Sequence, residues 1–105
     1  MRTLEFTVDC QKLRKKSDCD FSGIVAGSVG LLHAQFYCSM EWYGCKKAAS
    51  FWANGVEHAV MLDSMDCCVI PSEVLVGDRF EVSLTGVGSD LKITTNKTKV
   101  KQEVN

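Results

Sequence analysis

The chain has little of what marks membrane, exported, nucleic-acid-binding or multidomain proteins. It carries one proline and eight glycines in 105 residues, and no Pro/Gly/Ser-rich stretch divides it. No run approaches the roughly 18 apolar residues of a spanning helix, and Glu5 and Asp9 interrupt the N-terminal segment, so no signal peptide is expected. Twelve basic and thirteen acidic side chains leave a net charge of −1, which favours neither nucleic acid nor an acidic membrane. We therefore expect one domain over residues 1–105, without nucleic-acid binding or membrane insertion.

Sustained helical periodicity is also missing, and the dominant period is two. Leu4, Phe6 and Val8 alternate with polar residues, as in a strand with one wet face. The same alternation recurs over residues 32–39, 80–85 and 91–94. Residues 97–104 carry a row of lysines on one side, which is typical of an edge strand because charge discourages further pairing.

The strongest local signal is Asn54-Gly55 between two strand-like runs. Asn-Gly favours a two-residue type I′ turn, in which both central residues take positive φ. The register that follows pairs Ala53 with Val56, Phe51 with His58, and Ala49 with Val60, and it places Trp52 and Glu57 on the opposite face.

These patterns predict an all-β fold. About seven to eight short strands separated by turns are typical of an antiparallel β-sandwich, Ig-like or jelly-roll-like. Pro71 predicts the end of a strand, followed by one short helical turn near residues 71–76. The glycine-rich segment 21–30 is expected to be a loose turn between the first strands.

The six cysteines are the unusual feature of the composition. Their spacing offers no Cys-x₂₋₄-Cys pair of the kind that closes a zinc tetrahedron, and Cys67 and Cys68 point to opposite faces if they lie in a strand. Cys38 continues an apolar strand face. We expect free thiols that act as small hydrophobic side chains and mostly resist labelling, with no metal and no cofactor.

No catalytic residue is expected either. A thiol nucleophile needs a histidine in hydrogen-bond reach, but His33 is predicted on a polar face and His58 half in the core. The two basic runs, at 12–16 and 92–101, are interpreted as a solvated loop and an edge strand. Tyr37, Tyr43 and Trp52 remain as wet-face aromatic residues that can contact a partner.

The segment 36–51 reads aromatic, x, apolar, Ser, two residues, Trp-x-Gly, then Lys-x-Ala-x-Phe. With the segments 60–62, 69–75, 80–86 and 93–100 in the same order, it resembles the N-terminal β-domain of baseplate upper proteins and related tail-fibre proteins of phages and prophages of Gram-positive bacteria. The likeness covers nearly the whole chain. Its most specific parts are Trp42-x-Gly44 and Ile70-Pro71-x-Glu73.

The resemblance implies structural roles for the residues that carry it. Trp42 would plug one end of the sandwich, Gly44 would permit the turn after it, and Pro71 would end a strand. Phe51 is the last residue of the matching segment 36–51. Cys38 and Cys45 stand where relatives tend to have larger apolar residues, which makes them core-filling side chains. Relatives usually continue from this β-domain into a linker and an oligomerising or receptor-binding segment. That segment is not part of the resemblance, so receptor binding is not implied for this chain.

The function implied is a non-enzymatic virion component, made in the host cytoplasm, that docks on other tail or baseplate proteins, with copies of the chain itself as a further partner. Three other classes stay open. A carbohydrate-binding module would use the exposed aromatic residues, a Cys/His hydrolase would have one reactive cysteine, and a small regulatory protein would bind a host factor.

Overall fold

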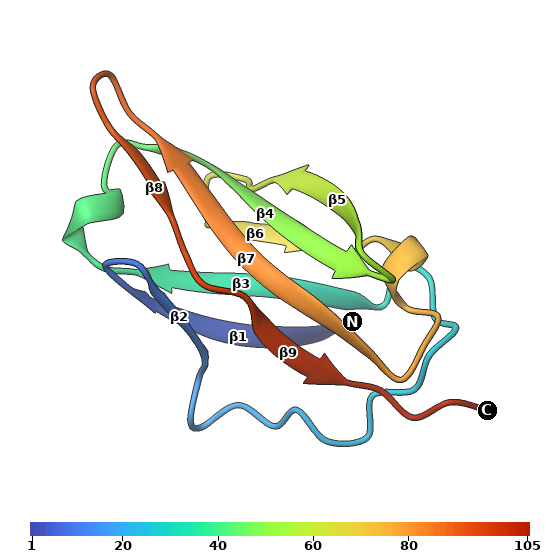
Figure 1. Cartoon of the computed structure of the whole chain (residues 1–105). Coiled ribbons are helices and arrows are strands. Elements are labelled where there is room, and N and C mark those ends of the chain that lie inside the picture. Colours follow the sequence, from blue (N-terminus) through green and yellow to red (C-terminus); the bar gives the residue numbers. More distant parts are fainter.

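The computed structural model describes residues 1–105 as two β-sheets that face each other across one hydrophobic core (Figure 1). Nine strands and two 3₁₀ turns follow one another along the chain. They are β1 (Arg2–Asp9), β2 (Lys12–Lys15), β3 (Leu32–Cys38), η1 (Met40–Trp42), β4 (Lys46–Ala53), β5 (Val56–Met61), β6 (Cys67–Val69), η2 (Ser72–Val74), β7 (Arg79–Val87), β8 (Lys92–Thr94) and β9 (Thr98–Lys101). The predicted all-β sandwich is confirmed.

The first sheet has the order β2-β1-β3-β6, and one of its pairings corrects the antiparallel expectation. β1 and β3 are parallel, with Arg2 opposite Leu32 and Val8 opposite Cys38. The reason is the long connection 16–31, which starts where Lys15 lies opposite Phe6 in the middle of β1 and ends beside Arg2 at its beginning. A strand that starts at the same end as β1 must run in its direction. The glycine-rich segment is therefore a crossover and not a simple turn.

β2 is a second correction, because its residues were expected to form a solvated loop. It pairs antiparallel with β1, and Leu13 is its one buried residue. One apolar residue among lysines and arginine shows no alternation, so sequence periodicity could not reveal this strand.

The second sheet has the order β5-β4-β7, with β8 and β9 both beside β7. The predicted hairpin register is confirmed, from Ala53 opposite Val56 to Ala49 opposite Val60. Asn54 and Gly55 have φ of 52° and 75°, the positive values that a type I′ turn requires.

β8 and β9 are two parts of one edge that is interrupted at residues 95–97. At the interruption the Asn96 side chain reaches the first sheet, where its Oδ1 accepts from the Leu13 N–H at 2.7 Å and its Nδ2 donates to the Leu13 carbonyl at 3.1 Å. The amide thus imitates a paired strand residue. It connects the β2 edge of one sheet to the β8–β9 edge of the other.

The inward rows of both sheets form the core, which is a cluster of 20 buried residues. Phe6 and Phe36 stack with ring centroids 5.3 Å apart, and Phe51 meets Phe80 at 6.3 Å. η2 lies in the region predicted for a helical turn, directly after Pro71. η1 was not predicted, and it forms one end of the molecule (Figure 1).

Candidate functional site

The connection between β3 and β4 is a tight cap held by its own hydrogen bonds. The N–H of Trp42 donates to the Ser39 carbonyl at 3.1 Å, and the N–H of Tyr43 donates to the Met40 carbonyl at 3.0 Å. Ser39 Oγ accepts from the Cys10 N–H at 2.8 Å. These bonds tie the cap to the β1–β2 turn and fix which side chains point inward.

Trp42 is the inward side chain of this cap. Its side chain is completely buried, and its Nε1 donates to the Cys10 carbonyl at 2.7 Å, so the one polar group of the indole is satisfied. A Cβ added at Gly86 of β7 would lie 2.7 Å from Trp42 Cε3. The indole ring therefore fits only because Gly86 has no side chain. Gly44, with φ of 80°, turns the chain away after the ring.

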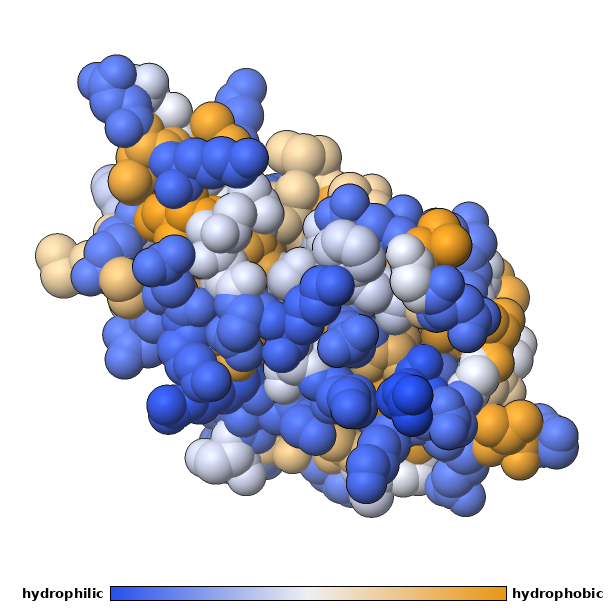
Figure 2. Space-filling model, in the orientation of Figure 1, coloured by the Kyte–Doolittle hydropathy of each residue, from blue (hydrophilic) through white to orange (hydrophobic).

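Because Trp42 points inward, Met40 and Tyr43 on either side of it point into solvent. Their exposed fractions are 90% and 93%, against 0% for Trp42. Single exposed apolar residues are common on protein surfaces, but two such large side chains beside a hollow are not. Figure 2 shows hydrophobic residues beside the β7–β8 turn, near the end that carries η1, and further ones at the opposite end of the molecule.

A hollow of about 660 Å³ opens beside these two side chains. It lies at the end of the sandwich, beyond the last inward-facing side chains of the two sheets. Cys38 is the last inward-facing residue of β3, and Lys47 is the first inward-facing residue of β4. The hollow is thus the mouth of the sandwich interior. We call its lining the end site, which comprises Cys38, Ser39, Met40, Trp42, Tyr43, Lys47 and Asp66.

One wall of the end site is charged, and the rest is apolar or neutral. Lys47 Nζ lies 3.2 Å from Asp66 Oδ1, and the Lys47 side chain is 13% exposed. Burial raises the pKa of the Cys38 thiol to about 11, with the Asp66 carboxylate adding to the effect. The thiol is therefore neutral at physiological pH, and thiols in that state are poor nucleophiles. Chemically the end site can accept an apolar group and offer an ion pair at its rim.

The three aromatic residues predicted as partner contacts do not form one surface. Tyr43 belongs to the end site. Tyr37 lies on the outer face of the first sheet, where its hydroxyl donates to Glu5 Oε2 at 2.6 Å, a bond that raises the pKa of Tyr37. Trp52 lies on the outer face of the second sheet, with Lys97 Nζ 3.7 Å from its ring centroid. Its Nε1 donates to Ser83 Oγ at 3.2 Å, so this ring is already engaged.

The six cysteines differ in burial, so only some of them can fill the core as the sequence predicted. All six are free. Cys68 is buried and Cys38 packs against the core, whereas Cys45 is only half-buried and lies outside the core cluster, and Cys10 is exposed. Burial raises the pKa of the Cys68 thiol to about 12. Core filling therefore applies to Cys68 and Cys38 and not to Cys45.

The two histidines lie on different sheets. His33 is on the outer face of β3 and His58 on the inward row of β5. No three His, Cys, Asp or Glu side chains lie close enough together to hold a metal ion. No helix is long and apolar enough to cross a membrane.

Sequence reasoning missed Met40, Lys47 and Asp66 as members of the end site. Met40 lies two residues before Trp42 in a segment without alternation, and this closeness to Trp42 was the only available signal. Lys47 lies on β4 of the second sheet and Asp66 lies just before β6 of the first, so only the packing of the two sheets brings them together, and no local pattern reveals it. Comparison of the chain with protein-family models and with curated proteins finds no match.

Proposed function

We propose that this chain is a non-enzymatic structural component of a phage or prophage tail, and that it docks on other tail or baseplate proteins through the end site. The observation that carries the proposal is the exposure of Met40 and Tyr43, at 90% and 93%, beside the 660 Å³ hollow. The tail as the place of docking comes from the resemblance carried by the Trp42-x-Gly44 and Ile70-Pro71-x-Glu73 segments.

The physics of the end site favours a protein partner. Methionine and tyrosine supply large contact area, and methionine adapts to the shape it meets. Burying one such side chain contributes about 1.5–3 kcal/mol, and a few central anchors carry most of the energy of an interface. A partner side chain that is apolar at its tip fits the hollow, while the Lys47–Asp66 pair at the rim offers polar contacts.

The hydrolase alternative receives no support from this chemistry, because the thiol in the hollow is protonated and its neighbours are an ion pair. The carbohydrate alternative needs a free aromatic face for stacking. Lys97 already covers Trp52, so that alternative depends on Tyr43 alone.

The test is incorporation into particles. Met40→Ser/Tyr43→Ser is expressed in place of the wild-type chain, and purified particles are probed for it after prophage induction. Docking through the end site predicts a strong loss of the double variant from particles. The matched control is Val29→Ser, which changes a 78% exposed residue in the loop before β3, at the opposite end of that strand from η1. Equal incorporation of the double variant and the control would falsify the assignment of the docking surface, and a binder of glycans or host factors would be absent from particles altogether.

A further inference from the structure

The free edge of β5 presents backbone groups in a regular row. The N–H of Leu62 donates to the Lys47 carbonyl at 3.0 Å, and the two-residue turn pairs Ala53 with Val56. Along an antiparallel ladder, hydrogen-bonded pairs alternate with pairs that are not hydrogen-bonded. Because Val56 and Leu62 belong to bonded pairs, the even-numbered residues between them also bond to β4. The N–H and C=O groups of Glu57, Ala59 and Met61 therefore point away from the sheet.

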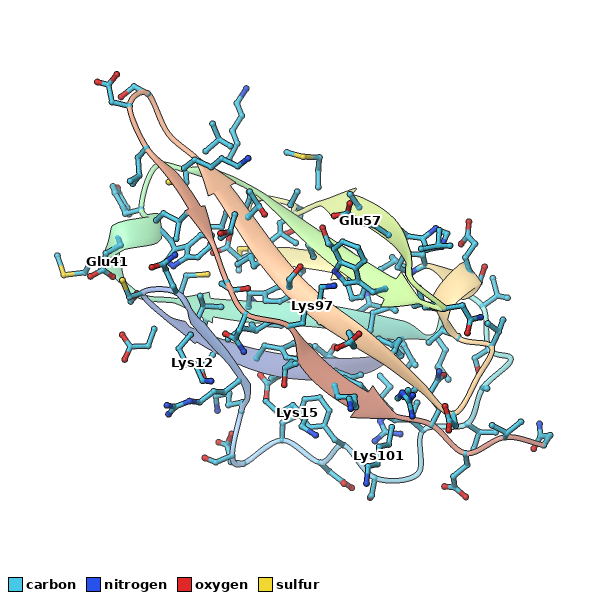
Figure 3. All side chains as sticks on the ribbon, viewed as in Figure 1. Lys12, Lys15, Glu41, Glu57, Lys97 and Lys101 are labelled. Carbon is cyan, nitrogen blue, oxygen red and sulfur yellow. The ribbon has the colours of Figure 1, made fainter.

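The other three edges of the sandwich are protected. β2 carries lysine and arginine side chains and is covered by Asn96. The β8–β9 edge is interrupted and carries a row of lysines, as Figure 3 shows with Lys97 and Lys101. β6 has three residues, and both backbone groups of its first residue, Cys67, bond to Asp63. Short length, charge and covering are the devices by which proteins prevent edge pairing.

β5 has none of these devices. It is six residues long, contains no lysine, arginine or proline, and its one charged residue is Glu57 (Figure 3). Val56, Ala59 and Met61 are exposed. An unprotected edge of this kind is a template for another strand.

We propose that β5 pairs with β5 of a second copy of this chain, antiparallel and centred on Ala59. The two-fold register places Ala59 opposite Ala59 and Glu57 opposite Met61, all of them residues whose backbone groups face the edge. The inward rows also match, because His58 then faces Val60 of the second copy. Two five-stranded sheets become one continuous sheet.

The side chains of β5 favour a copy of the chain as the occupant. Ala59 at the centre lets the two backbones approach, since opposed residues in a hydrogen-bonded pair have Cα atoms only about 5.5 Å apart. The two Glu57 residues are kept apart by four residues of strand, roughly 14 Å, which exceeds the screening length of about 8 Å at physiological salt. A single negative charge per strand therefore does not oppose self-pairing.

The pairing surface is small, so the dimer is expected to be reversible and visible as a rise in sedimentation coefficient with protein concentration. Ala59→Lys puts two ammonium groups face to face at the centre and lowers the association constant by at least about tenfold. Thr94→Lys is the matched control, because it changes another exposed small residue on the opposite edge of the same sheet. It leaves association unchanged.

Mixing distinguishes this register from any other. Ala59→Lys and Ala59→Glu each remain monomeric alone, and an equimolar mixture regains the dimer because position 59 of one copy faces position 59 of the other. Circular dichroism of each variant monitors the fold. A wild-type chain that stays monomeric at every concentration overturns the proposal, as does a dimer that Ala59→Lys leaves intact, or a mixture that does not associate. The outcome is independent of docking at the end site, which β5 does not line.

Discussion

At the scale of single residues, the end site depends on a glycine, Gly86, whose lack of a side chain makes room for Trp42. Trp42 lies on Gly86 so closely that a Cβ there would come within 2.7 Å of the indole. Because the ring occupies the interior, its neighbours Met40 and Tyr43 are forced outward. One glycine on β7 therefore sets the surface of the β3–β4 cap.

Gly86→Ala is expected to lower the free energy of unfolding by about 1–3 kcal/mol, the usual cost of overpacking a filled core. Alanine normally favours a strand over glycine, so the sign of the effect is diagnostic. Gly88→Ala is the control, because a Cβ there meets its nearest atom at an ordinary 3.6 Å. Urea unfolding of both variants measures the difference, and equal stabilities would show that Trp42 does not need the space.

The thiols give a pH-dependent prediction at the same scale. Burial raises the pKa of Cys38 from 9.0 to about 11 and that of Cys68 to about 12, and the reactive species is the thiolate. At pH 8 the thiolate fraction of Cys38 is about 100-fold below that of an ordinary cysteine. Labelling of the folded chain is therefore expected at the exposed Cys10 first, with Cys38 gaining rate as the pH rises towards 11 and Cys68 protected throughout. Peptide mapping after maleimide treatment measures each site, and early labelling of Cys68 contradicts its burial.

At the scale of elements, the two sheets are joined unequally at their edges. On one side Asn96 bonds to both backbone groups of Leu13. On the other side β5 forms an open edge, whereas β6 is short and its Cys67 bonds to Asp63. The closed side stabilises the fold, and the open side is available for pairing.

Asn96→Ala leaves the N–H and C=O of Leu13 without these partners, in a residue that is 1% exposed. The expected loss of unfolding free energy is about 1–3 kcal/mol. Gln11→Ala removes a single exposed bond, to the Thr94 carbonyl, and is expected to cost less. Denaturant unfolding compares the two, and a smaller effect of Asn96→Ala than of Gln11→Ala argues against the connection between the sheets.

The elements also show how far the sequence could predict this structure. Alternation revealed β1, β3 and β7, and the Asn54-Gly55 turn predicted the register of β4 with β5, because these signals are local. The parallel pairing of β1 with β3 depends on where the 16–31 connection ends, and β2 contains one apolar residue. Neither leaves a periodic signal. The end site was found in part, through Trp42 and Tyr43, whereas Lys47 and Asp66 meet only through tertiary packing.

At the scale of the whole molecule, the sandwich has one closed side, one open side and one end where its interior opens. The end site combines an apolar mouth, two exposed large side chains and an ion pair, and we propose it as the docking contact. The β5 edge suits a second copy of the chain. The two surfaces are separate, so an assembled protein can use both.

The most direct measurement of the proposed role is the position of the chain in induced particles, determined by immunogold electron microscopy. Docking on the tail predicts gold label at the distal end of the tail, retained after particle purification. Purified particles without label, while the chain is abundant in the lysate, would contradict a structural role in the virion.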